Sequence, residues 1–506
     1  MVVPESQDVQ LPPSGSVGRG TSQQYGSNLS SSQHSGSPQH FSSNGNISPV
    51  NTGLHYEPQD YTETDYLLPT QLYGSSRFSG SVRAKDAGGS GAPAESVCSM
   101  VLQILVPFLL AGLGTVSAGV LLEVVQNWDV FQEVPEIFIL VTAILGMKGN
   151  LEMTLASRLS TAVNAGKMEH AREKWMLIVG NLALKQLQAT VLGLLASLMA
   201  TVLGWMAEGK MPLHHVMLLV STSVSTAFVA SLLQGIIMVG VIIGAKRMGF
   251  NPDNVATPMA ASFGDLITLA LLACFSRWFY SLIDLYPHVL YLVVLLLLCL
   301  IPLWVVISSK HPASCILLRT GWEPIITAMF ISSIGGLILD KTVSDPNLAG
   351  IIVYAPVING IGGNLVSIQS SRVSTELHLN YSPGEVPEDR KGCFSPCRTF
   401  FGSGANHRSA QILLLLVIPG QLVFLLTIHL MKGGNTFHMY VVIFFLCILF
   451  FLYIVVLHYH LCLSLRGKDP DSYSIPYLTA LGDLLGTALL SLAFVMLWYI
   501  GDSGGV

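Results

Sequence analysis

Long runs of apolar residues recur along most of this chain and constrain its fold more than any other feature. From about residue 97 to the C-terminus, these runs are long enough to cross the roughly 30 Å hydrocarbon core of a bilayer as helices. Only 11% of the 506 residues are charged, whereas a soluble domain has about 25%. The chain is therefore predicted to be an all-α polytopic membrane protein that has the lipid bilayer as a partner.

Eleven membrane spans are predicted, and they follow a long polar segment. Residues 1–95 are rich in Ser, Gly, Pro, Gln and Asn and contain no apolar signal-peptide core. Such a composition buries too little surface to offset chain entropy, so this segment is predicted to be a disordered cytoplasmic tail. The predicted spans are residues 96–122, 137–147, 175–207, 216–245, 255–276, 289–309, 324–339, 348–371, 410–431, 439–465 and 473–500.

Several sequence blocks occur twice at nearly constant offsets, which indicates an internal repeat. Gly149-Asn150 recurs as Gly363-Asn364, and the block at positions 119–123 recurs at positions 336–340 with almost the same offset. Five spans then form each repeat, and the sixth span has no equivalent. We predict a first repeat over residues 96–285, a linking transmembrane helix over 286–310 and a second repeat over 311–506.

The extra linking span determines how the two repeats are oriented. Five spans leave the chain on the opposite side of the membrane, and one further span returns it, so the repeats are predicted to be parallel. With the N-terminus in the cytoplasm, nineteen of the 25 Lys and Arg residues lie in cytoplasmic segments and four in outer loops. This bias predicts a cytoplasmic N-terminus and an extracellular C-terminus.

Two aspartates in equivalent apolar spans are the main candidate site residues. Asp265 and Asp483 both follow glycine at matching positions of the two repeats, and the residues on their helix faces are small or hydroxylated. A carboxylate inside a bilayer is costly and indicates a functional site. Mg²⁺ keeps much of its water and is usually held by one or two carboxylates. The pair is thus predicted to bind a partly hydrated Mg²⁺, although an Asp that only bridges helices is the structural alternative.

Two further residue pairs are candidates at equivalent positions of the repeats. Asn150 and Asn364 are expected at breaks in the second and eighth spans, where freed backbone carbonyls would help to coordinate the cation. Glycine-rich packing between helices is the alternative there. Asp253 and Asp471 are expected at the cytoplasmic starts of the two aspartate helices, where they either recruit cations or cap helices beside a proline.

Three basic residues near or within the spans need separate explanations. Lys185 lies inside the third span and is predicted either to snorkel to the membrane surface or to form a buried ion pair. Arg158 and Arg372 are expected to anchor their spans at the cytoplasmic interface.

These motifs closely resemble those of the eukaryotic solute carrier family 41. The resemblance covers residues 97–500, and it rests on Gly149-Asn150 with Arg158, on residues 251–265, and on the second-half Gly363-Asn364 and Gly482-Asp483. That family is similar to the membrane domain of the bacterial MgtE magnesium channel. The resemblance implies two parallel five-helix MgtE-like repeats that form a pseudo-dimer within one chain, and it matches Asp265 and Asp483 to the pore aspartate.

The resemblance also implies a function. We expect a plasma-membrane transporter of divalent cations, chiefly Mg²⁺, and neither an enzyme nor a nucleic-acid-binding protein. Channel-like conduction and exchange with Na⁺ as the coupling ion both stay open. The alternative from another class is an intramembrane aspartyl protease, which also uses two membrane aspartates. Its Gly-x-Gly-Asp motif is missing here, because Ser262 and Ala480 lie three residues before the aspartates. A structural scaffold is a third possibility.

Overall fold

The computed structural model describes residues 97–209, 211–283, 285–380, 405–431 and 470–499. The predicted tail (1–95) and the tenth predicted span (439–465) lie outside these described residues. Within the described residues there are helices and no strand, so the all-α prediction is confirmed. Ten stretches of these residues are long and apolar enough to cross a membrane, and they coincide with the other ten predicted spans.

The helices of the first repeat begin and end at residues that explain their limits. The repeat contains α1 (Val97–Val125), the short α2 (Asp129–Glu133), α3 (Glu136–Asn164), α4 (Ala171–Glu208), α5 (Leu213–Met248) and α6 (Pro252–Ile283). Helices α4 and α5 end at Gly209 and Gly249, whose φ angles of 75° and 74° lie in the left-handed region that glycine adopts readily. Pro252 at the start of α6 loses no helical hydrogen bond there.

The predicted linking span is a kinked pair of helices. It consists of α7 (Pro287–Cys299) and α8 (Ile301–Ser309), which meet at Leu300. Pro302 has no backbone N–H and cannot complete the helical hydrogen bonds across this point, which accounts for the kink. The pair packs against α4 and α5 and leaves Leu292, Leu295 and Leu296 about 60% exposed, as expected for a helix that faces lipid. A short helix, α9 (Pro312–Thr320), follows.

The second repeat contains the counterparts of the first. They are α10 (Glu323–Val343), the 3₁₀ turn η2 (Ala349–Val353), α11 (Ala355–Asn380), α13 (Ala405–Met431), the π-helical turn η4 (Pro470–Ser474) and α15 (Ile475–Tyr499). Helices α1, α3, α4 and α6 correspond to α10, α11, α13 and α15, in the order that the sequence repeat predicts. The sequence repeat pairs α5 with the tenth predicted span, which lies outside the described residues.

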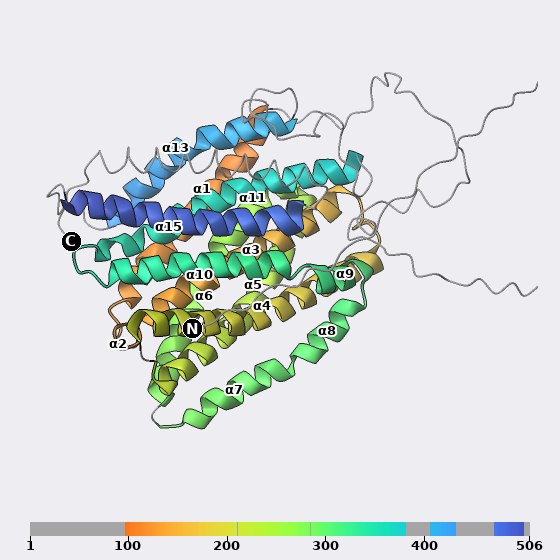
Figure 1. The fold of residues 1–506 in the computed structure, drawn as a ribbon. Coiled ribbons are helices and arrows are strands. Elements are labelled where there is room, and N and C mark those ends of the chain that lie inside the picture. Colours follow the sequence, from red (N-terminus) through yellow and green to blue (C-terminus); the bar gives the residue numbers. More distant parts are fainter. Residues whose placement is uncertain (1–96, 210, 284, 381–404, 432–469, 500–506) are drawn as a thin grey trace, which may run out of the picture. The chain divides into compact units, whose positions relative to one another are not determined.

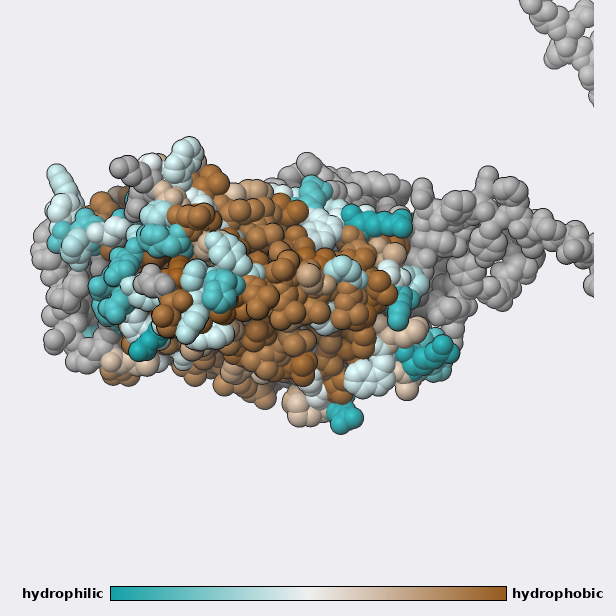
Figure 2. Space-filling view, turned by 90° about the horizontal axis from the view of Figure 1, so that it is seen from below, coloured by the Kyte–Doolittle hydropathy of each residue, from teal (hydrophilic) through white to brown (hydrophobic). Residues whose placement is uncertain are grey.

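The two repeats interlock and share one apolar core (Figure 1). Helix α3 packs against α10 and α15 of the second repeat, and α11 packs against α1 and α6 of the first. One close approach of the two repeats uses Gly336, where a Cβ atom would lie 2.9 Å from the carbonyl oxygen of Ile139. Figure 2 shows apolar side chains in the middle of one face and hydrophilic ones toward both ends, as a bilayer requires.

The expected breaks near Asn150 and Asn364 are absent. Helix α3 runs without interruption through residues 148–150, and α11 runs through residues 360–364. A single glycine costs a helix only about 1 kcal/mol, and burial within the bundle outweighs that cost. The irregular backbone lies elsewhere, in η2 before α11 and in η4 before α15. Freed carbonyls at Asn150 and Asn364 therefore do not occur.

Candidate functional site

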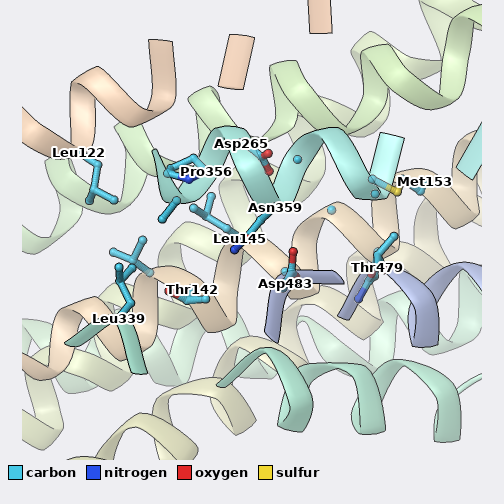
Figure 3. A pocket seen from close by; sticks show the side chains of 17 residues that line it. Leu122, Thr142, Leu145, Met153, Asp265, Leu339, Pro356, Asn359, Thr479 and Asp483 are labelled. Carbon is cyan, nitrogen blue, oxygen red and sulfur yellow. The ribbon is translucent and has the colours of Figure 1, made fainter. Parts of the chain in front are cut away.

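A cavity lies between the two repeats at the level of the paired aspartates. Its volume is about 60 Å³, and since one buried water needs about 10–15 Å³ in this measure, several waters fit. Helices of both repeats form its wall, and Asp265 and Asp483 both reach into it (Figure 3). The lining residues are Leu122, Val141, Thr142, Leu145, Gly146, Gly149, Asn150, Met153, Asp265, Leu339, Ala355, Pro356, Asn359, Gly360, Gly363, Thr479 and Asp483.

The cavity is built with the symmetry of the sequence repeat. Leu122 and Leu339, which are equivalent in the two repeats, both line it, as do Asp265 and Asp483. The two carboxylates are close enough for electrostatic repulsion between them. Two carboxylates that face one cavity with room for several waters attract a cation when they are ionised, so the arrangement of the predicted pair is suited to a hydrated divalent ion.

Glycines at equivalent positions make room for the two aspartates. A Cβ atom on Gly146 would lie 2.7 Å from Oδ2 of Asp483, and one on Gly360 would lie 3.9 Å from Oδ2 of Asp265. These two glycines are related by the same offset that relates Gly149 to Gly363. The constant repeat offset is the sequence signal that identifies these two glycines.

The two aspartates differ in their hydrogen bonds. Ser332 on α10 donates to Oδ2 of Asp483 at 3.1 Å. The equivalent residue of the first repeat, Thr115, donates instead to the carbonyl oxygen of Gly112 at 2.9 Å. No side chain in the described part of the chain donates to Asp265. The carboxylate of Asp265 is therefore the less constrained of the two.

Of the two predicted asparagines, one lines the cavity. Asn150 does so, and its side-chain oxygen accepts a hydrogen bond from Thr479. Asn364 is buried in α11 but is not among the lining residues. Asn359, one and a half turns earlier on the same helix, lines the cavity instead and donates to Thr487 at 3.0 Å. Comparison of the two repeats does not identify Asn359 as a site residue, because the equivalent position of the first repeat is the apolar Leu145.

Asp253 is buried where the two repeats meet. It is 1% exposed and accepts hydrogen bonds from Ser371 and Thr375 on α11, both at 2.8 Å. Asn164 at the end of α3 also donates to it at 2.9 Å. The carboxylate of a first-repeat helix is thus bound mainly by hydroxyls of the second repeat.

Asp471 is held in the reciprocal way. It is fully buried and accepts hydrogen bonds from Ser157 and Thr161 on α3, the latter at 3.2 Å, and from Ser374 on α11 at 2.7 Å. The hydroxyls of Thr161 and Thr375 are 3.4 Å apart, so these equivalent residues meet each other. We call Ser157, Thr161, Ser371, Ser374 and Thr375, with the two aspartates, the hydroxyl belt.

The three basic residues are buried. Lys185 forms the ion pair that was one of its two predicted explanations, with its Nζ atom 2.6 Å from Oε2 of Glu152. Arg158 and Arg372 are each 7% exposed, and Arg372 donates to the side chain of Asn254 at 2.8 Å. Neighbouring helices therefore cover both arginine side chains, and the predicted anchoring at the cytoplasmic interface stays a prediction.

Comparisons with known proteins support a transport function. The MgtE family, described as a divalent cation transporter, matches residues 141–275 and 355–493. Solute carrier family 41 member 2 of Homo sapiens is 64% identical over 82% of this chain and 73% of that protein, and the Xenopus laevis protein of that name is 57% identical over 94% and 86%. Solute carrier family 41 member 3 of Rattus norvegicus is 46% identical over 80% and 89%.

Proposed function

Because this chain belongs to solute carrier family 41 and contains the MgtE divalent cation transporter domain twice, we propose that it carries Mg²⁺ through the cavity between its repeats. Divalent cation transport follows from the family, whose members are transporters and not enzymes. The intramembrane protease alternative has no support from either family match. The choice of Mg²⁺ and the residues that bind it are the proposal.

The observation that carries the proposal is the single cavity shared by two equivalent aspartates. Asp265 of α6 and Asp483 of α15 come from different repeats, yet both line one cavity that has room for several waters. Two independent pathways would instead place each aspartate in a cavity of its own. The chain then acts as a pseudo-dimer in which each half supplies one carboxylate to one ion.

The character of the other lining residues favours an ion that keeps its water. Asn150, Asn359 and Thr479 are neutral polar groups, and Gly146, Gly149, Gly360 and Gly363 leave space beside them. Mg²⁺ gives up water reluctantly, and a site with two carboxylates and several retained waters suits it. Asn150 and Asn359 would contact those waters. Asn364, which lies outside the lining, would act only by supporting α11.

The test is Mg²⁺ uptake by purified full-length protein in proteoliposomes. Asp265→Asn keeps the size of the side chain and removes its charge, so we expect uptake to fall by at least about ten-fold, because each 1.4 kcal/mol of lost binding is a factor of ten. Asp483→Asn should have a comparable effect, and the double variant should be little worse, since residues that act on one ion are not additive.

Asp345→Asn is the matched control, because Asp345 is an exposed aspartate that does not line the cavity. It should transport normally. Uptake near the normal rate in Asp265→Asn would show that the ion binds elsewhere. Half of the normal rate in each single variant would show two separate pathways.

The proposal also covers the coupling of Mg²⁺ transport to Na⁺ and the membrane in which the protein lies. If the protein exchanges Mg²⁺ for Na⁺, a higher Na⁺ concentration inside the vesicles than outside should accelerate Mg²⁺ uptake. If it conducts like a channel, Na⁺ should have no effect on uptake at a fixed membrane potential. The chain is a multi-pass membrane protein. We propose the plasma membrane as its location, with the N-terminus in the cytoplasm and the C-terminus outside.

A further inference from the structure

Two buried atoms of metal-ligating side chains face each other at the end of the bundle where α3 and α5 begin. They are Oε2 of Glu136, in the first turn of α3, and Nδ1 of His215, in the first turn of α5. We propose that Glu136 and His215 bind one Zn²⁺ ion. The site is separate from the cavity, because neither residue is part of the cavity lining.

The two atoms are too far apart for a hydrogen bond and close enough to share an ion. They are 3.7 Å apart, whereas N–H···O hydrogen bonds span about 2.7–3.2 Å. Zinc binds imidazole nitrogen and carboxylate oxygen at about 2.0–2.2 Å, so two ligands of a tetrahedral ion lie about 3.4 Å apart. A shift of a few tenths of an ångström brings both atoms onto one ion.

Burial makes the missing partners of these atoms significant. The Glu136 side chain is 3% exposed and that of His215 is 17% exposed. Within the described part of the chain, no hydrogen-bond partner reaches Oε2 of Glu136 or Nδ1 of His215. A buried polar atom without a partner costs about 1–3 kcal/mol, and such atoms in native proteins indicate a water or an ion. One shared ion satisfies both atoms.

A direct ion pair between a protonated His215 and Glu136 is the competing explanation. Charge-assisted N–H···O hydrogen bonds are short, about 2.7–2.9 Å. The separation of 3.7 Å between these atoms is well beyond that range. The geometry therefore favours an ion between the two side chains over direct contact.

Neighbouring residues position the two ligands. Gly204 on α4 leaves room for Glu136, because a Cβ atom at Gly204 would lie 2.6 Å from Cγ of Glu136. The exposed ring of His214 packs edge-on against the ring of His215, with centroids 4.6 Å apart, and restrains its orientation. The described residues contain no cluster of three His, Cys, Asp or Glu side chains that could hold a metal, so water completes the coordination of the ion.

The ligand types distinguish this ion from the proposed cargo. Mg²⁺ takes oxygen ligands, whereas imidazole nitrogen suits zinc and related transition metals. In the alignment that pairs Asn150 with Asn364, the equivalent of Glu136 is Gly350, so the fold that the repeats share does not require a carboxylate at this position. In the proposed orientation, the site lies at the extracellular end of α3.

The experiment counts the zinc ions bound by the purified full-length protein, by competition with a chromophoric chelator. Excess Mg²⁺ is present to suppress sites that accept any divalent cation. Glu136→Gln and His215→Ala should each bind one zinc ion fewer per chain than the unmodified protein. The double variant should also bind only one fewer, because both side chains hold the same ion.

His214→Ala is the matched control, because it removes an exposed histidine adjacent to His215. It should bind as many zinc ions as the unmodified protein. A bound ion stabilises the folded state, so zinc should raise the melting temperature of the unmodified protein and of this control. Most of that increase should be lost in Glu136→Gln and His215→Ala.

An unchanged number of zinc ions in Glu136→Gln and His215→Ala would overturn the inference and show that water or an ion pair satisfies the two atoms. Loss of the ion in His214→Ala alone would also overturn it. Each variant is first checked for a single gel-filtration peak, and Glu136→Ala or His215→Gln replaces one that does not fold. The inference does not depend on the proposed function, because zinc binding is measured without transport.

Discussion

At the scale of single residues, two kinds of aspartate lie within the helix bundle: Asp253 and Asp471 are buried, whereas Asp265 and Asp483 are half-buried. Asp253 and Asp471 are surrounded by donors, and hydroxyls from both repeats bind them. Asp483 accepts one hydrogen bond from Ser332, and no described side chain donates to Asp265. Natural proteins tolerate poorly satisfied charges mainly at functional sites. The two aspartates proposed to bind the ion thus differ from the two that the hydroxyl belt holds.

This difference predicts opposite effects on stability. Asp253→Asn replaces an acceptor of three hydrogen bonds, and hydrogen bonds to charged groups contribute about 1.5–3 kcal/mol each. We expect a clearly lower melting temperature of the detergent-purified protein. Asp265→Asn removes a charge that repels Asp483 and Glu152, so its melting temperature should be unchanged or higher.

The measurement must be made without added divalent cations, because a bound ion stabilises the folded state. Equal melting temperatures for Asp253→Asn and the unmodified protein would indicate that Asp253 recruits cations and does not hold the repeats together.

At the scale of elements, α3 and α11 form the centre of the molecule. Each contacts the two aspartate helices, α6 and α15, and each contributes hydroxyls to the belt. On α3, Asn150 lines the cavity, and Ser157 and Thr161 follow two and three turns later in the belt. The belt therefore joins the repeats two to three turns along α3 from the cavity. If the proposed ions leave the cavity in this direction, we expect α3 and α11 to separate there.

A disulfide across the belt should therefore stop transport. Thr161 and Thr375 are suitable positions, because their hydroxyl oxygens are 3.4 Å apart. In the double variant Thr161→Cys with Thr375→Cys, we expect oxidation to abolish Mg²⁺ uptake and a reducing agent to restore it. Formation of the disulfide can be checked by cutting the chain at a protease site inserted at residues 284–286, because the two repeats then stay covalently joined only if the disulfide has formed.

Each single cysteine variant is a control and should show no response to oxidation. Complete linkage with normal uptake would show that the belt does not open during transport and that the pathway leaves the cavity by another route.

At the scale of the whole molecule, the two repeats pack against each other, and the orientation of the chain in the membrane determines which end of the bundle faces the cytoplasm. In the proposed orientation, the loop between α10 and η2 is extracellular, whereas the C-terminal end of α11 is cytoplasmic. Lys and Arg are concentrated on the side assigned to the cytoplasm, as the positive-inside rule requires.

Glycosylation tests this orientation, because acceptor sites are modified only on the side that is extracellular in the mature protein. The native acceptor site at Asn380 should carry no glycan in cells. Ala349→Ser creates an acceptor site at Asn347, an exposed residue of the α10–η2 loop, and this variant should gain a glycan. A glycosidase-sensitive mass that disappears with Asn380→Gln would reverse the orientation.

Much of the architecture was predictable from the sequence because it depends on local composition and on repetition. Apolar runs of about 20 residues have few stable forms in a bilayer other than helices. Matching offsets identified the repeats, and an ionisable residue within such a run stands out without a structure. The helices and the positions of Asp265 and Asp483 on a common cavity agree with those predictions.

Only the tertiary structure decided which side chains meet between helices. Glu152 pairs with Lys185, 33 residues away, and Ser371 binds Asp253, 118 residues away. The rotation of α11 places Asn359 on the cavity and leaves Asn364 outside it. Such contacts depend on the crossing angles and rotations of packed helices, which hydropathy and repeat offsets do not specify. The sequence by itself thus determined the helices, the repeat and the paired aspartates, whereas packing determined the cavity, the hydroxyl belt and the ion pair of Lys185 with Glu152.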